Sequence, residues 1–226
     1  MARKLVVLGA VGNCLDIVDA ARLSREYAPI GFLDDGDWQA DALVDGLPVL
    51  GPLSHAARMP DAWFVCGIGS PRSFRSKRDI ISRLAIPSER FATIIHPSSV
   101  VSPSATVGAG SVILAHTAIC AAARVGQHVM MLPGGVVGHD SRIGDYSIAA
   151  ARVTLSGRVI IGTSCYLGAS SSYREGITVG DGSMLGMGAV VVRDVPANSV
   201  EVGVPARPMG ERGAVAAKTK SEIMQT

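Results

Sequence analysis

Aliphatic residues recur at every sixth position over residues 95–191 of the chain. The series runs Ile95, Val101, Val107, Ile113, Ile119, Val125, Met131, Val137, Ile143, Ala149, Leu155, Ile161, Leu167, Tyr173, Val179, Leu185 and Val191. Only Ala149 and Tyr173 are not Ile, Val, Leu or Met. A fixed hydrophobic period of this kind indicates a repeat in which each unit adds one short element to a continuous core. The pattern therefore predicts a solenoid.

The other positions of the repeat follow a pattern as well. The residue four places after each aliphatic position is usually small or β-branched, and glycine often follows the aliphatic residue directly, as in VGAGSV and IGDYSI. The small residue would fill a tight corner, and glycine would permit the turn of the backbone. Ordinary hairpin strands do not explain the pattern, because their hydrophobic period is two and every turn resets their register. We predict an all-β domain of hexapeptide repeats over residues 91–210, followed by a polar tail, residues 211–226.

Residues 1–90 lack the six-residue period and read as alternating strands and helices. The apolar run KLVVLG leads into a segment with helical apolar spacing at Leu15, Val18 and Leu23, and IGFLDD and WFVCGIGS read as further short strands. The ends of such strands form the usual ligand crevice of an open α/β sheet. We predict a Rossmann-like domain with candidate ligand-binding residues Gly9, Gly12, Asp34, Asp35, Gly67, Gly69 and Arg75.

Three of these candidates, Gly9, Gly12 and Arg75, also have a structural explanation. The glycines of GAVG open a helix and would suit a phosphate, yet a plain βαβ packing turn explains them as well. Arg75 belongs to a cationic run over residues 72–78, which is more typical of a solvated helix face. The phosphate-binding role of both features stays a hypothesis at this level.

Composition narrows the class of protein. Charged residues make up 18% of the 226 residues, the formal net charge is +2, and no basic cluster alternates with aromatic residues, so we expect no nucleic-acid partner. No apolar stretch approaches the length of a membrane helix, and we expect a cytoplasmic protein that does not enter a membrane. The four cysteines form no CxxC pair, which favours reduced thiols over a disulfide or zinc site.

The order of these segments resembles the sialic-acid O-acetyltransferase type family, which includes N-acetyltransferases of nucleotide-linked 4-amino sugars. The resemblance covers about residues 3–210 and rests on GFLDD, IHPSSVVSPSATVG, VVGHDSRIGDYS, LSGRVIIG and VGVPAR together. It implies a left-handed parallel β-helix in which three hexapeptides form one triangular coil, giving between five and six coils. It also implies that residues 1–90 bind a nucleotide-linked sugar, and that the protein is a homotrimer with active sites between subunits.

The same resemblance assigns roles in acetyl transfer from acetyl-CoA to a sugar. His139 in the GHD motif would be the general base, and Asp140 would orient its imidazole. Gly157, one coil later, would donate its backbone N–H to the thioester carbonyl, although a glycine needed only for the turn is an alternative. The GVPAR loop would lie beside coenzyme A, through Gly203, Pro205, Ala206 and Arg207. A solvated Arg207 is an alternative to a phosphate contact. His96 and His116 are better explained as structural and surface residues.

Three departures from the family leave the acceptor open. One is the glycine-rich turn, which reads GAVGNC without the extra Gly and His common in relatives. Many N-acetylating relatives carry Asn seven residues before the catalytic His and a second His nine residues after it, where this chain has Leu132 and Ile148. We expect transfer to an amino group of a nucleotide-linked sugar, with transfer to a sugar hydroxyl as the alternative. The acyl group could also be larger than acetyl.

Two rival functions share the predicted fold. A γ-carbonic-anhydrase-like protein would hold zinc through three histidines, but His116, His128 and His139 occupy three different positions of the coil, so we expect no metal. A non-catalytic scaffold or sensor would agree with Leu132 and Ile148. The intact GHD motif, with Gly157 one coil later, argues against that second reading.

Overall fold

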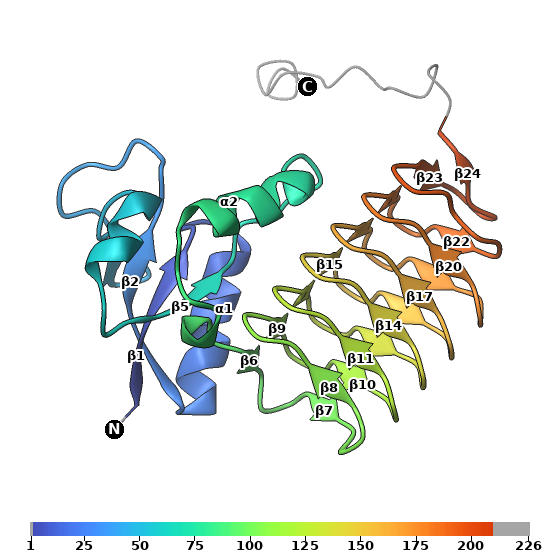
Figure 1. Cartoon of the computed structure of the whole chain (residues 1–226), viewed down its shortest axis with the longest axis horizontal. Coiled ribbons are helices and arrows are strands. Elements are labelled where there is room, and N and C mark those ends of the chain that lie inside the picture. Colours follow the sequence, from blue (N-terminus) through green and yellow to red (C-terminus); the bar gives the residue numbers. More distant parts are fainter. Residues whose placement is uncertain (1, 210–226) are drawn as a thin grey trace, which may run out of the picture.

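The computed structural model describes residues 2–209, and the predicted tail, residues 211–226, lies outside them. An α/β unit precedes a left-handed parallel β-helix, as predicted (Figure 1). No helix within the described residues is long and apolar enough to cross a membrane.

The α/β unit has a three-stranded parallel sheet in the order β2-β1-β5, formed by Arg3–Leu8 (β1), Tyr27–Leu33 (β2) and Trp63–Cys66 (β5). Its other elements are α1 (Asn13–Ser24), the hairpin of β3 (Leu43–Val44) and β4 (Leu47–Pro48), η1 (Leu53–Arg58), η2 (Phe74–Ser76), α2 (Lys77–Arg83) and η3 (Ser88–Arg90). The predicted apolar face of the first helix was partly wrong. Leu15 and Leu23 are exposed, and the buried stripe is formed by Cys14, Ile17, Val18 and Ala21, which share the helical spacing more closely.

Strands of two or three residues stack into the three faces of a triangular prism. From β6 to β22 each residue of a strand pairs with the residue 18 positions later, as Ile119 does with Val137, whereas β21 pairs with β23 at a spacing of 16 and β24 adds an antiparallel strand. We call the face against which the α/β unit packs the covered face. It contains β6 (Ile94–Ile95), β9 (Val112–Ile113), β12 (Met130–Met131), β15 (Ile148–Ala149), β18 (Tyr166–Leu167), β21 (Met184–Leu185), β23 (Val200–Val202) and β24 (Arg207–Pro208). The small face contains β7 (Val100–Val101), β10 (Ala118–Ile119), β13 (Val136–Val137), β16 (Thr154–Leu155), β19 (Ser172–Tyr173) and β22 (Val190–Val191). The arginine face contains β8 (Thr106–Val107), β11 (Arg124–Val125), β14 (Arg142–Ile143), β17 (Ile160–Ile161) and β20 (Thr178–Val179).

Three corners join these faces, and we name each after one residue on it. The His116 corner leads from the covered face to the small face, the His139 corner from the small face to the arginine face, and the Tyr146 corner back to the covered face. The second residue of each strand points inward, so the aliphatic series forms the core of the prism, as the period predicted.

Buried serines at the corners hold successive coils together. Ser141 Oγ donates to the carbonyl of Ser156 at 2.8 Å and accepts from the Val159 N–H at 3.0 Å. Ser111 repeats this arrangement with Gly126 and Val129. The sequence pattern predicted small residues here for steric reasons, and the structure adds that a hydroxyl satisfies backbone groups that would otherwise be buried without a partner.

The α/β unit packs against the covered face, whose outward side chains are apolar. Ile94, Val112, Met130 and Ile148 are buried in one cluster with residues of α1 and the sheet. Two cations add polar contacts at the Tyr146 corner. Arg75 donates twice to the Gly182 carbonyl, at 3.1 and 2.9 Å, and the Lys77 ammonium donates to the His128 carbonyl at 2.6 Å. The prediction of a solvated cationic run is therefore wrong for Lys77, which is 1% exposed.

His128 forms the centre of this contact. Its imidazole is 4% exposed, stacks on Tyr146 and meets Phe91 edge-on. Burial and, to a smaller extent, the nearby Lys77 lower the pKa of His128 to about 4, and Asp145 partly opposes the shift. The folded protein therefore keeps this histidine neutral.

We expect His128 to make stability depend on pH. Because its pKa is about 6.5 in the unfolded chain, the unfolded state takes up a proton first as pH falls, and stability decreases between pH 6.5 and 4. The loss attributable to His128 approaches about 3 kcal/mol at the lower limit. Urea unfolding at several pH values measures it. His128→Phe, which keeps the aromatic contacts, should flatten this part of the curve, and an unchanged slope would contradict the assignment.

Candidate active site

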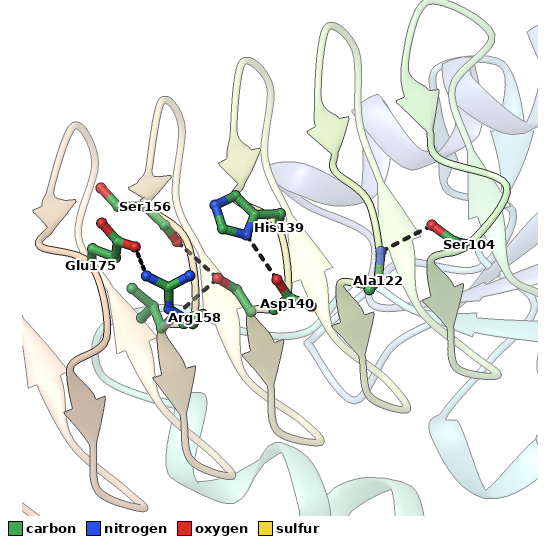
Figure 2. Close-up of polar contacts among 9 residues, drawn as sticks. Ser104, Ala122, His139, Asp140, Ser156, Arg158 and Glu175 are labelled. Carbon is green, nitrogen blue, oxygen red and sulfur yellow. Dashed lines mark hydrogen bonds and ion pairs between the residues drawn. The ribbon is translucent and has the colours of Figure 1, made fainter.

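His139 lies on the His139 corner with its imidazole half exposed. Its Nδ1 is 2.8 Å from Asp140 Oδ2. Asp140 has φ 60°, a left-handed conformation that Asp tolerates better than most residues and that turns its carboxylate back toward the ring (Figure 2). With Nδ1–H donating to the carboxylate, Nε2 keeps its lone pair and faces outward. The arrangement can accept a proton from a nucleophile at the surface of the prism.

Gly157 lies one coil later, directly against the imidazole. A Cβ atom at this position would be 2.4 Å from His139 Nε2, closer than real contacts allow. Its φ lies outside the left-handed region, so the alternative of a glycine needed only for the turn is wrong; Arg158 is the left-handed residue at that corner. Within residues 2–209 the Gly157 N–H donates no hydrogen bond. Only glycine leaves the imidazole in this position, because the ring occupies the space that a side chain would need.

An ion pair follows on the next two coils of the same corner. The guanidinium of Arg158 contacts the carboxylate of Glu175, and both side chains are at least half exposed. Figure 2 shows His139, Asp140, Arg158 and Glu175 along one edge of the prism. Sequence reasoning missed this pair, because nothing in the local sequence marks a contact between successive coils.

A cavity of about 550 Å³ opens at the carboxyl ends of β1, β2 and β5. Six of the seven predicted ligand-binding residues line it: Gly9, Gly12, Asp34, Asp35, Gly67 and Gly69. The structure also adds residues that the motifs did not indicate, among them Asn13, Leu53, Ser70 and Ser73. Asn13 and Ser70 directly follow predicted glycine turns, which is the signal that could have identified them. None of the lining residues is Lys or Arg.

The two aspartates that line the cavity differ in how many hydrogen bonds their carboxylates already accept. Asp34 accepts from the Ala10 N–H through Oδ2, and from the Gly36 N–H and the Trp38 indole through Oδ1. Among residues 2–209, Asp35 accepts only from the Leu53 N–H, through Oδ1. Asp34 therefore braces the loops around the cavity, and Asp35 keeps an oxygen available for a ligand.

The remaining candidates lie elsewhere. Arg75 is absent from the cavity lining because its guanidinium binds the Gly182 carbonyl. Gly203, Pro205 and Arg207 form an exposed loop at the far end of the prism, and Ala206 is buried there. Burial raises the pKa of the Cys14 thiol to about 12, so Cys14 lines the cavity as an apolar, un-ionised group.

The other histidines do not converge. His116, His128 and His139 lie on three different corners of the prism. His96 Nδ1 contacts the Ser98 hydroxyl at 2.8 Å, which fits the predicted structural role. No group of three His, Cys, Asp or Glu side chains suited to a metal occurs in the described part of the chain.

The cavity and His139 are separated within one chain. The α/β unit sits on the covered face, and the position of Gly69 is so close to Ile148 that a Cβ there would be 2.3 Å from Ile148 Cδ1. His139 lies on the corner that does not border this face. Ile148 is buried under the α/β unit of its own chain and cannot meet His139 of that chain.

Family models match both parts of the chain. The PglD N-terminal domain matches residues 4–80, and the hexapeptide repeat of succinyl-transferase matches residues 158–193.

Solved structures with the same architecture extend the match to almost the whole chain. The acetyltransferase domain of PglB from Neisseria gonorrhoeae FA1090 is 30% identical, with a TM-score of 0.82, over 92% of this chain and 100% of that one. It is also known in complex with acetyl coenzyme A. A mutant of perosamine N-acetyltransferase from Caulobacter crescentus, in complex with CoA and GDP-perosamine, is 28% identical over 92% of this chain and 97% of that one, with a TM-score of 0.82.

Curated relatives match over shorter stretches. GDP-perosamine N-acetyltransferase of Escherichia coli O157:H7 is 34% identical over 122 residues, which are 52% of this chain and 55% of the relative. UDP-3-O-acylglucosamine N-acyltransferase of Caulobacter sp. (strain K31) is 34% identical over 73 residues, 32% of this chain and 22% of the relative. The matched stretches thus span less than two thirds of these relatives.

Proposed function

Because the chain belongs to the family of left-handed β-helix acetyltransferases with a PglD-type N-terminal domain, we propose that it transfers an acetyl group from acetyl-CoA to an amino group of a nucleotide-linked sugar. One observation carries the proposal. The imidazole of His139, oriented by Asp140, lies directly against a glycine whose N–H is free.

The chemistry follows from these three residues. His139 Nε2 takes a proton as the sugar nitrogen attacks the thioester carbonyl and forms the C–N bond. The Gly157 N–H donates to the oxygen that becomes negative, and Asp140 stabilises the imidazolium. When the C–S bond breaks, the proton held by His139 passes to the departing thiolate. The products are an amide and free coenzyme A.

The α/β unit would bind the nucleotide part of the acceptor. Backbone N–H groups at the start of α1 suit a diphosphate, because the residue that caps the helix, Gly12, has no side chain to occupy them. Asp35 keeps an oxygen that can accept from a base or a ribose. Acetyl-CoA would approach along the later coils of the His139 corner, toward the loop of Gly203, Pro205, Ala206 and Arg207 at the end of the prism.

Because the cavity and His139 are separated within one chain, a homotrimer is favoured in which the cavity of one subunit and His139 of its neighbour together form one active site. Prisms can pack through the small face, whose outward side chains carry no charge and are no larger than valine. They are Val100, Ala118, Val136, Thr154, Ser172 and Val190. With the small faces turned toward a threefold axis, the His139 corner of one subunit lies beside the His116 corner of the next.

Thiol release from acetyl-CoA tests the proposed activity. We expect turnover with one member of a panel of nucleotide-linked amino sugars, and none with the corresponding hydroxyl sugars. Product mass distinguishes an amide from an ester. Thiol release only with hydroxyl sugars would mean that the acceptor group is a hydroxyl and not an amine. No release with any acceptor would contradict the proposal.

A further inference from the structure

Two arginines are stacked on the arginine face without a countercharge. Arg124 and Arg142 are paired in register on β11 and β14, and both are exposed. Across residues 2–209 neither guanidinium lies within ion-pair distance of a carboxylate. Like charges directly opposite each other on neighbouring strands are destabilising. The pair therefore forms an exposed cationic surface suited to an acidic partner.

An acidic pair lies on α1, at another edge of the molecule. Asp16 and Asp19 are exposed and line a small depression of about 120 Å³ together with His96, Leu114, Ala115 and Pro133. The last four residues belong to the start of the prism and the His116 corner. This contact places the acidic face of α1 beside the His116 corner.

Both pairs occur at the same height along the prism. Ala115 belongs to the corner segment that precedes Arg124 in the same coil, and Pro133 belongs to the one that precedes Arg142. Parallel prisms related by a threefold axis have equivalent coils at equal heights. In the proposed trimer, the arginines of one subunit thus face the His116 corner of the next at the level of that subunit's Asp16 and Asp19.

We infer that Arg124 and Arg142 of one subunit bind Asp16 and Asp19 of its neighbour in the trimer. This inference rests on the proposed function, because it assumes the arrangement in which subunits share a site. It explains how the site is assembled: α1 begins at the cavity, so fixing its acidic face against the arginine face holds the cavity beside the neighbour's His139.

The other charged side chains near the arginine pair and the acidic pair do not prevent the proposed ion pairs. Arg22 is 3.4 Å from Asp19 but closer to Asp45, at 2.6 Å. Asp16 has no cationic partner in the described residues. At the corners themselves, Arg152 lies on the His116 corner, and Asp140 and Arg158 occupy the His139 corner with partners of their own.

Charge reversal tests the inference. The variant Arg124→Glu/Arg142→Glu places acid against acid, and we expect the dissociation constant of the trimer, measured by sedimentation, to rise by at least about 10-fold. Activity per chain should fall in parallel at low protein concentration. Adding Asp16→Arg/Asp19→Arg to the same chain restores opposite charges and should recover both. Arg58→Glu/Arg78→Glu, an equal charge change on exposed residues of the α/β unit, should leave assembly unchanged.

Three outcomes would overturn the inference. One is an unchanged trimer in the reversed variant, and another is a wild-type protein that sediments as a monomer. The third is an intact trimer with a raised KM for the nucleotide sugar that the aspartate reversals do not rescue, which would make the arginines a diphosphate site. Sedimentation needs no turnover, so a trimer that transfers no acetyl group would contradict only the proposed activity.

Discussion

Replacing His139 by alanine should lower kcat by about 10²- to 10⁴-fold, the usual contribution of a positioned general base. The attacking sugar nitrogen can still lose its proton to water, and the Gly157 N–H still binds the carbonyl oxygen, so a small activity should remain. The fold should not change, because the side chain is 52% exposed. Thiol release under saturating acetyl-CoA measures the loss.

The matched control is His55→Ala. His55 lies in η1, outside the cavity lining and far along the chain from the prism, so its loss should leave kcat unchanged. An His139→Ala protein that assembles normally and turns over like the wild type would refute the role of His139 as base.

The His139→Ala variant can also show whether two subunits together form the site. Ser70→Trp should block the cavity while leaving His139 intact, because Ser70 lines the cavity and is exposed. When inactive His139→Ala and Ser70→Trp chains are mixed and reassembled, about one quarter of the sites should combine an intact cavity with an intact histidine. Recovery of activity supports sharing, whereas a mixture as inactive as its parents would mean that each chain uses its own cavity.

Replacing Gly157 by alanine should lower kcat by about 10²-fold or more, although only one methyl group is added. That methyl group would be 2.4 Å from Nε2 and 2.6 Å from Cε1 of His139, so the half-exposed ring must turn away from its position beside the N–H. Because φ at residue 157 is in the ordinary region, the backbone accepts alanine. We therefore expect little change in the free energy of unfolding.

A double-mutant cycle provides the control for Gly157. If the methyl group acts by displacing the imidazole, Gly157→Ala should have almost no further effect on kcat in the His139→Ala protein. Equal losses in both backgrounds would mean that residue 157 acts independently of His139, through the oxyanion alone.

The sequence determined the prism and the core of the site because both depend on short, regular spacings. A hydrophobic period of six can bury its aliphatic residues only if each coil repeats the last, which predicted the rungs from β6 to β22 but not β23 and β24. His139 and Asp140 are neighbours in the chain, and Gly157 is one coil away. Their association therefore required no knowledge of distant contacts. The reason for the glycine was visible only in the structure.

Contacts between the two parts of the chain were decided by tertiary structure alone. Arg75 and Lys77 bind backbone carbonyls at Gly182 and His128, and any residue offers a carbonyl, so no motif marks the partner. Asp34 braces loops instead of remaining free for the same reason, since its donors are mainly backbone N–H groups brought together by the sheet. The position of the α/β unit on the covered face likewise separates the cavity from His139, and no local pattern predicts it, because burial of apolar side chains is not directional.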